Sequence, residues 1–370
     1  MFTRQSKLPP TKSVDGAPFE HDGLAPHRKL SRKMLLIIIG VVIAIALGVG
    51  LGVGLGVGLG GGDDNEGGSS SGSGGNHTTS PYPTPTGNVT NRVFWQPAVN
   101  SSWQIVLLNP IEVAADATQT TPNVDVFDID LFTNSQTTID KLHSLGKKVI
   151  CYFSAGSYEP FRPDASQFQP SDIGAELDGW PGEHWLRLGS TNVRNIMAAR
   201  IKLASGMGCD AIDPDNVDGY SNKNGLGLTE DDSIDFMRFL SQQAGQYNMS
   251  CGLKNAGDII ESVIDFTHFS VNEQCVQYDE CSTFAPFIQH NKPVFHIEYP
   301  DGTSKTLAGV QNFAIDTVNK YCSDSGNAAN STNFSTVLKN MNLDGWVEYC
   351  SASVSTTLTN TNVTTSSAPS

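Results

Sequence analysis

Short apolar runs alternate with segments of helical period over most of the chain. Eight runs rich in β-branched and aromatic residues predict buried strands at residues 103–108, 124–129, 148–154, 210–212, 250–254, 266–271, 294–299 and 345–348. Segments of helical period predict helices between them, at residues 137–144, 192–205, 230–247, 258–263 and 307–321. This alternation predicts an α/β fold, a (β/α)8 TIM-type barrel rather than an open sheet. A nucleotide-binding open sheet is disfavoured because no glycine-rich phosphate loop follows the first strand.

A separate apolar segment, residues 34–60, carries no ionisable side chain. As a helix its 27 residues would measure about 40 Å, more than the roughly 30 Å of a bilayer core. Residues 1–33 have a net charge of +4, whereas Asp63, Asp64 and Glu66 follow the segment. We therefore expect a single transmembrane helix before the barrel, a type II signal anchor with its basic tail in the cytoplasm. A cleaved signal peptide is the weaker alternative, since the run is long and starts far from Met1.

The composition of the remaining chain separates a folded region from two polar flanks. Residues 61–91 are rich in Gly, Ser, Thr and Pro, which predicts a flexible stalk, and residues 352–370 predict a Ser/Thr-rich disordered tail. Residues 92–351 remain, a length typical of one barrel domain. We expect this domain to face the extracellular space or the cell wall, either held at the membrane or released by cleavage of the stalk.

All seven cysteines and all seven Asn-X-Ser/Thr sequons follow the apolar segment, which agrees with glycosylation and an oxidising compartment. An odd number of cysteines leaves one thiol over, and Cys151 is the expected one because it lies inside an apolar strand. The expected disulfides are Cys275–Cys281, Cys322–Cys350 and Cys209–Cys251. The spacing of cysteines and histidines fits no metal motif, so we predict no metal and no cofactor.

The chain beyond the N-terminal tail is strongly acidic. The whole chain has a net charge of −15, and subtracting the +4 of residues 1–33 leaves −19. An acidic surface disfavours nucleic acid and anionic substrates and would attract a polycation, although solubility alone would also explain it.

Carboxylates gather where the predicted strands end. Residues 210–220 contain four aspartates directly after a helical segment, and Glu273 follows another predicted strand. Like charges are costly to bury together, so such a cluster indicates work on a ligand. The strand ends of a barrel meet in one cleft, and two carboxylates there, Asp215 and Glu273, make glycoside hydrolysis the leading hypothesis. The other predicted cleft residues are Asp128, Asp130, Tyr152, Ser154, Asp213, Asn216, Asp218, Tyr220, Lys254, Asn272, Glu298 and Tyr299.

Four strings in this region together resemble glycoside hydrolase family 114. They are Val-Ile-Cys-Tyr-Phe-Ser-Ala-Gly at 149–156, Asp-Pro-Asp-Asn-Val-Asp-Gly-Tyr at 213–220, Leu-Lys-Asn at 253–255 and Asn-Glu-Gln-Cys at 272–275. The resemblance extends over roughly residues 93–350 and implies an endo-α-1,4-polygalactosaminidase that cuts cationic, galactosamine-rich exopolysaccharides. The N-terminal segment is similar to that of membrane-tethered fungal members. By similarity to related α-galactosidase-type barrels, Asp215 would be the nucleophile and Glu273 the acid/base of a retaining mechanism.

The other cleft residues have two interpretations each. Lys254 could bind a sugar hydroxyl, or form a structural ion pair with Asp215 or Asp213. Strand alternation places Asp213 on the same side as Asp215 but one layer deeper, which favours an orienting role. A substrate ammonium could bind Asp128, Asp130 or Asp218, each of which could equally cap a helix or pair with a cation. Tyr152, Tyr220, Tyr299 and the loop residue Trp180 could contact sugars or pack at the rim.

Three other functions compete with a cofactor-free retaining endo-glycosidase. A non-catalytic carbohydrate-binding barrel would keep the cleft without turnover, and intact Asp215 and Glu273 argue against it. A different α-galactosidase-like hydrolase would use the same groups on a neutral sugar. A polysaccharide deacetylase would need a His/Asp metal set, which the sequence does not display.

Overall fold

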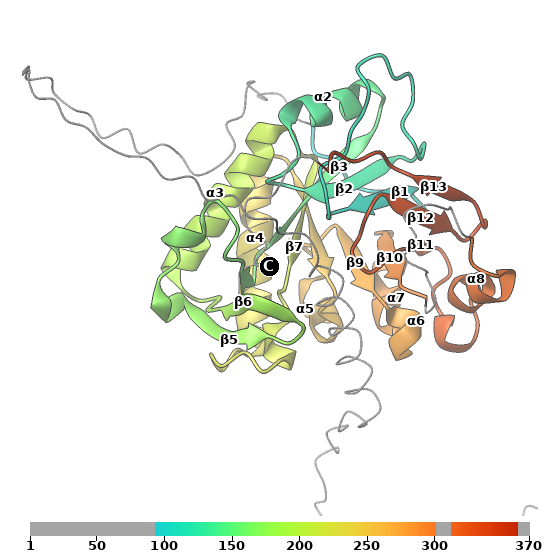
Figure 1. The fold of residues 1–370 in the computed structure, drawn as a ribbon. Coiled ribbons are helices and arrows are strands. Elements are labelled where there is room, and N and C mark those ends of the chain that lie inside the picture. Colours follow the sequence, from blue (N-terminus) through green and yellow to red (C-terminus); the bar gives the residue numbers. More distant parts are fainter. Residues whose placement is uncertain (1–92, 301–311, 362–370) are drawn as a thin grey trace, which may run out of the picture. The chain divides into compact units, whose positions relative to one another are not determined.

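Eight parallel strands form the centre of the fold in the computed structural model (Figure 1). The structure describes residues 93–300 and 312–361. In spatial order the strands are β1 (Trp103–Val106), β2 (Val126–Asp130), β3 (Lys148–Ser154), β7 (Ala211–Asp215), β8 (Ser250–Lys254), β9 (Phe269–Glu273), β10 (Val294–Glu298) and β11 (Ser335–Leu338). The first seven coincide with or overlap the predicted strands.

The predicted eighth barrel strand was wrong. Residues 345–348 overlap β12 (Trp346–Tyr349), which pairs antiparallel with β11, and β13 (Val354–Thr356) continues the sheet in the same way. The true eighth strand, β11, is only four residues long and half polar, so it has no strong apolar signal. The domain also extends beyond the predicted boundary at residue 351. It includes β13, and Thr359 forms a β-bridge with Ile111.

The ten-stranded sheet curls so that β11 approaches β1. Nε1 of Trp103 donates to the carbonyl oxygen of Ser335 at 2.7 Å, and Nζ of Lys339 donates to Oε1 of Gln104 at 3.0 Å. These bonds join the two ends of the parallel array. The arrangement is a mixed α/β fold consistent with a TIM-type barrel.

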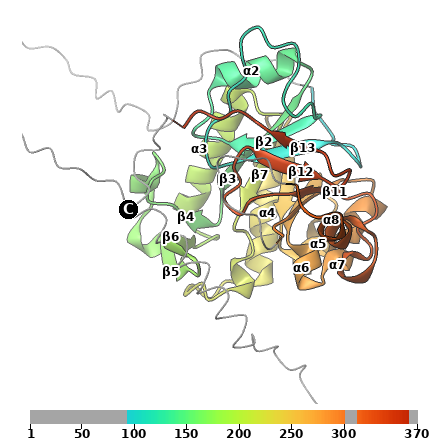
Figure 2. The same cartoon turned by 45° about the vertical axis from the view of Figure 1, so that its right-hand side comes forward.

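Helices follow most of the strands and surround them (Figures 1 and 2). They are α2 (Gln136–Ser144), α3 (Thr191–Met207), α4 (Glu230–Gly245), α5 (Ile260–Val263), α6 (Cys275–Tyr278), α7 (Cys281–Gln289) and α8 (Ile315–Cys322). Local sequence sets their ends: Ser190 accepts from the backbone of Val193 at the start of α3, and Thr229 and Asp232 form a capping box at the start of α4. Predicted helix 307–321 is confirmed from residue 315, and residues 307–311 lie outside the described residues.

A small antiparallel sheet lies between β3 and α3 in the sequence and was not predicted. It consists of β4 (Ser157–Tyr158), β6 (Trp180–Leu186) and β5 (Ile173–Leu177) in that spatial order. Five short 3₁₀ helices complete the regular elements of the described residues: Ala165–Gln167, Pro170–Asp172, Gly219–Ser221, Gly257–Ile259 and Gly326–Ala328. Both views show the small sheet on the same side of the molecule as α3 and α4.

Two of the three expected disulfides are confirmed, Cys275–Cys281 and Cys322–Cys350. The expected free thiol was wrong, because Cys151 bonds to Cys209 and buried Cys251 is free, which also excludes the expected Cys209–Cys251 pair. The strands β3 and β7 are neighbours, and this brings Cys151 of β3 within a Cα–Cα distance of 5.9 Å of Cys209, which precedes β7.

The membrane prediction lies outside the described residues, since it rests on residues 1–91. Within residues 93–300 and 312–361, every helix is too short or too polar to cross a bilayer.

Candidate active site

The inward-facing side chains of the parallel strands change from apolar to charged along each strand. Successive inward positions on β7 are Ala211, Asp213 and Asp215, and on β9 Val271 precedes Glu273. Every second residue of a strand points into the same space, so this order follows from strand geometry. The apolar members belong to one buried cluster, and the charged members lie at the carboxyl ends of the strands, where barrel folds place their active sites.

Lys254, the last residue of β8, lies between the two carboxylates predicted to be catalytic. Its Nζ is 3.2 Å from Oδ1 of Asp215 and 3.0 Å from Oε2 of Glu273. The Lys254 side chain is 3% exposed, whereas those of Asp215 and Glu273 are 16% and 24% exposed. Burial opposes the charge of Lys254, but the two carboxylates outweigh it and raise its pKa well above the ordinary value. A ligand can therefore reach both carboxylates while the ammonium between them stays buried.

Asp215 is held by groups from two neighbouring strands. Its Oδ2 accepts from the hydroxyl of Tyr152 at 2.8 Å, and its Oδ1 accepts from the backbone N–H of Asn216 at 2.8 Å. The Asn216 side chain in turn donates to Oγ of Ser154 at 3.0 Å. Gly156 permits this contact between strand ends, because a Cβ there would lie 1.7 Å from the backbone oxygen of Asn216. Residues 149–156 therefore supply the side chains of Tyr152 and Ser154 and the glycine at 156 that together position Asp215.

Glu273 accepts three side-chain hydrogen bonds, from Lys254, Tyr299 and Asn255. Burial alone would raise the pKa of Glu273, but the Lys254 ammonium and then the Tyr299 hydroxyl lower it below the ordinary value. Asn255 also accepts from the backbone N–H of Glu273 at 2.9 Å, and the Asn272 side chain reaches Asn255 at 3.5 Å. Glu273 is therefore ionised in this arrangement.

Asp128 and Asp213 are fully buried next to these groups. Neither carboxyl group bonds to any other described side chain or backbone group, apart from the interaction between the two carboxyls themselves. Burial, and then the charge of Asp213, raise the pKa of Asp128 well above its ordinary value. Burial raises the pKa of Asp213 to about 7. Asp213 thus lies one layer below Asp215, and Asp128 is out of reach of an oligosaccharide in this structure.

Two further predicted carboxylates have protein partners. Asp130 accepts from the guanidinium of Arg162 at 2.6 Å. Glu298 is fully buried and accepts from Nε2 of His296 at 2.9 Å and from the backbone N–H of Val276 at 2.6 Å. These contacts hold the loops after β2 and β9.

Asp218 and Tyr220 follow β7 and are half-buried. Burial and then the charge of Asp215 raise the pKa of Asp218 to about 6, which places its carboxyl in the same electrostatic environment as the nucleophile candidate. Tyr220 packs against the large hydrophobic cluster between strands and helices.

Sequence reasoning missed Glu183, a half-buried residue of β6 in the small sheet. Burial, and then the nearby charge of Glu159, raise the pKa of Glu183 to about 8, and Asp215 adds to this rise. No local pattern marks this residue, because only the pairing of β4 with β6 brings it near Asp215. Trp180, the predicted sugar platform, begins the same strand and is 61% exposed.

Among the described residues, only Cys275, Cys281 and His296 have donor atoms close enough together to hold a metal ion, all within 4.8 Å. The two cysteines are bonded to each other, so their thiolates are not available as ligands. The group therefore does not fit a zinc site.

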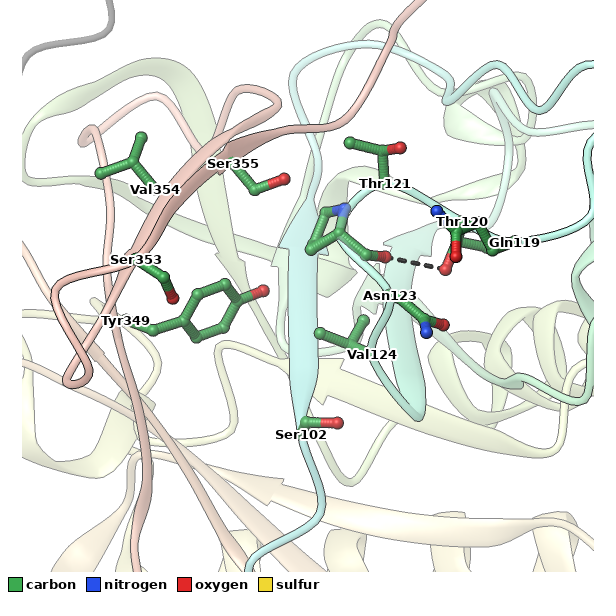
Figure 3. Close-up of a pocket in the computed structure, with 11 residues that line it drawn as sticks. Ser102, Gln119, Thr120, Thr121, Asn123, Val124, Tyr349, Ser353, Val354 and Ser355 are labelled. Atoms are coloured by element: carbon green, nitrogen blue, oxygen red, sulfur yellow. Dashed lines mark hydrogen bonds between the residues drawn. The ribbon is translucent and has the colours of Figure 1, made fainter.

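A hollow of about 430 Å³ lies at the opposite end of the strands (Figure 3). Its wall includes the residues that precede β1 and β2, whereas Asp215 and Glu273 end their strands. The lining carries no charged side chain and consists of Ser102, Gln119, Thr120, Thr121, Pro122, Asn123, Val124, Tyr349, Ser353, Val354 and Ser355. This hollow is separate from the carboxylates.

Comparison with known proteins agrees with this geometry. The model of glycoside hydrolase family GH114 matches residues 84–355. A crystal structure of Aspergillus fumigatus Ega3 in complex with galactosamine is 53% identical, covers 71% of this chain and 100% of that chain, and has a TM-score of 0.63. A single-residue variant of the glycoside hydrolase domain of PelA from Pseudomonas aeruginosa is 11% identical, covers 66% of this chain and 96% of that chain, with a TM-score of 0.51, and shows a shared fold alone. A search of curated proteins gave no match.

Proposed function

The chain belongs to glycoside hydrolase family GH114, and we propose that it is a retaining endo-glycosidase that cleaves α-1,4-linked galactosamine in a galactosamine-rich exopolysaccharide. The enzyme class follows from the family. The substrate is proposed because the 53% identical Ega3 was crystallised with galactosamine, and because an acidic chain suits a cationic polymer.

The short distances around Lys254 support the retaining mechanism. One ammonium contacts Asp215 at 3.2 Å and Glu273 at 3.0 Å, so the two carboxylate oxygens are no further apart than these distances laid end to end. That limit applies to the two oxygens that face Lys254, and it is compatible with the roughly 5–5.5 Å between the carboxyl groups of retaining enzymes, in which one carboxylate attacks the sugar directly. Inverting enzymes hold their carboxyl groups roughly 6.5–9.5 Å apart, with room for a water between them.

In the proposed reaction Asp215 attacks the anomeric carbon while the bond to the leaving oxygen breaks. Glu273 takes up a proton from solvent, gives that proton to the leaving oxygen and afterwards removes a proton from the water that hydrolyses the glycosyl ester. Tyr152 and Asn216 orient Asp215, and Tyr299 and Asn255 orient Glu273. Because the free enzyme holds Glu273 ionised, we expect kcat/KM to be highest on the acidic side of neutrality.

The cellular location is a separate proposal. Residues 34–60 would anchor the chain, with the catalytic domain outside, as their lack of charge and their flanking residues indicate. Protease treatment of sealed microsomes should leave the domain protected and glycosylated, and a mature chain that begins after residue 60 would refute the anchor.

The decisive experiment for the activity uses the detergent-solubilised full chain and α-1,4-linked oligomers of equal length. Internal cleavage of the deacetylated galactosamine oligomer, with the α-anomer released first in the NMR spectrum, is the expected result. Binding without cleavage would indicate a carbohydrate-binding barrel, equal cleavage of the galactose oligomer an α-galactosidase-like hydrolase, and release of acetate from the N-acetylated oligomer a deacetylase.

A further inference from the structure

Glu183 is a half-buried carboxyl group near the nucleophile candidate, and it takes part in no ion pair among the described residues. We propose that it receives the ammonium group of the substrate sugar and so determines the preference for galactosamine over N-acetylgalactosamine. This inference rests on the proposed function, because it names the group that reads the amine in the same site.

The pairing of β4 with β6 brings Glu183 close to another glutamate. Ser157 pairs with Trp185 and Tyr158 with His184, which is the last pair of β4. Glu159 follows Tyr158 and Glu183 precedes His184, so the two glutamates flank this pair on the same side, and the charge of Glu159 acts on Glu183. Two carboxylates this close repel each other when both are ionised, so one of them either holds a proton or needs a cation.

The compensating charge within the protein is already engaged by other carboxylates. Arg162 binds Glu159 at 2.8 Å and Asp130 at 2.6 Å, and all three side chains are at most 8% exposed. Among the ion pairs of the described residues, none includes Glu183. Arg162 faces Glu183 but forms its ion pairs with the other two carboxylates, so Glu183 stays protonated at neutral pH unless a further cation arrives.

The surroundings of Glu183 lead directly to the catalytic groups. The Ser157 hydroxyl hydrogen-bonds to Glu183, accepts from the Asn216 side chain at 3.1 Å and contacts Ser154 at 2.6 Å. Asn216 is the residue that binds Asp215 through its backbone N–H. A sugar whose anomeric carbon meets Asp215 would therefore hold its neighbouring 2-amino group in this region.

The groups that face Glu183 determine how it responds to such a ligand. They are Glu159 and Arg162 after β4, the Ser157 hydroxyl on β4, and Asp215 at the end of β7. Burial and then Glu159 raise the pKa of Glu183 to about 8, so the empty site holds a proton there at neutral pH. An arriving ammonium favours the ionised carboxylate, and binding should release that proton to solvent.

The first test compares substrates. Glu183→Gln should lower kcat/KM for deacetylated oligomers by about 10-fold or more, the scale of one charge-assisted hydrogen bond, and leave N-acetylated oligomers within about twofold. Glu176→Gln is the matched control, because Glu176 is an exposed carboxylate on β5 of the same small sheet. Equal loss for both substrates, or no loss in Glu183→Gln, would overturn the proposal.

The second test needs no turnover and therefore stands if the proposed cleavage does not occur. Calorimetric titration of the full chain with galactosamine at pH 7, in two buffers of different ionisation enthalpy, should show proton release in the wild-type protein and in Glu176→Gln. Proton release should be clearly smaller in Glu183→Gln, because only Asp213 and Asp218 then remain near the site with pKa values raised to about 7 and about 6. The thermal midpoint should stay within a few degrees of wild type. Unchanged proton release in a folded Glu183→Gln would refute the role of Glu183.

Discussion

Two buried lysines at the carboxyl ends of parallel strands show how differently one residue type is used in two regions of this barrel. Lys254 ends β8 and contacts the carboxylates of Asp215 and Glu273, which raise its pKa well above the ordinary value against the effect of burial. Lys339 follows β11 and donates to two neutral oxygens, the side-chain Oε1 of Gln104 at 3.0 Å and the backbone oxygen of Asp344 at 2.7 Å. Burial lowers the pKa of Lys339 to about 7.

This difference in partners distinguishes a lysine at the catalytic site from a lysine with a structural role. At the catalytic end a buried cation is kept charged by two carboxylates, and a ligand that enters can compete for those charges. At the seam between β1 and β11 a lysine supplies hydrogen bonds to close the sheet, and it can do so without a charge. A strongly shifted pKa of a buried group therefore indicates function where the partners of that group are charged and a ligand can reach them. It indicates a structural role where the partners are neutral.

The largest expected effect follows from removing the charged partners of Lys254. Asp215→Asn and Glu273→Gln should each lower kcat by about 10³-fold or more, because each residue has a bond-making role. The thermal midpoint should fall only modestly, since the amides keep the size of the carboxyls and Lys254 keeps one carboxylate as its partner in each variant. Asp210→Asn, directly before the same strand β7, is the control and should retain activity.

The roles of the two carboxylates can be separated with azide. A small-side-chain variant of Asp215 should regain turnover with azide and give a glycosyl azide of inverted configuration, if Asp215 is the nucleophile. The same product from a Glu273 variant would exchange the two roles, and near wild-type turnover in either amide variant would remove that residue from the mechanism.

Sequence reasoning located the charged end of the barrel because its signal is local. The alternation along β7 places Asp213 and Asp215 on one face, and Lys254 and Glu273 stand at the ends of their own recognisable strands. The ion pair of Lys254 with Asp215, one of two alternatives for this lysine, is confirmed.

The seam and the small sheet could not be predicted in the same way. β11 is short and half polar, and the role of Lys339 depends on the approach of β11 to β1, which no local pattern encodes. Glu183 and the Cys151–Cys209 disulfide likewise depend on which strands are neighbours. The missed features are thus those that pairing between distant segments creates.

The second prediction tests Lys254 directly. Lys254→Met should lower the free energy of unfolding by about 3–5 kcal/mol, because it leaves two carboxylates facing each other without their cation. Lys148→Met is the control: Lys148 binds Asp210 at 2.8 Å but is 41% exposed, so its loss should be at most about 1 kcal/mol. If chemical denaturation shows the same loss of unfolding free energy in both variants, then the burial of Lys254 does not increase the contribution of its ion pairs to stability.

The third prediction concerns Lys339 at the seam between β1 and β11. The pKa of Lys339 is lowered to about 7 in the folded protein, against about 10.4 in an unfolded chain, so the unfolded state binds more protons between these values. Its contribution to stability should therefore rise with pH from about 7 to about 10, by at most about 1.4 kcal/mol per pH unit. Lys339→Met should lack this rise when unfolding free energies at pH 7 and 9 are compared. An unchanged slope would mean that Lys339 stays protonated.

The smallest effect is expected at Asp213, where the same linkage has the opposite sign. Burial raises the pKa of Asp213 to about 7, against about 3.9 in an unfolded chain, so the folded state binds more protons between these values. Its contribution to stability is fully present below about pH 4 and is lost as the pH rises through about 7. The interaction with Asp128 divides this proton between two carboxyls, so the slope should be less than about 1.4 kcal/mol per pH unit. Asp213→Asn should reduce the fall in unfolding free energy between pH 5 and 6.5, whereas Lys339→Met should leave that interval nearly unchanged. If Asp213→Asn instead lowers stability most at pH 6.5 and above, then Asp213 is ionised in the folded protein and acts as a third counter-charge of Lys254, which would extend the charged end of the barrel by one layer.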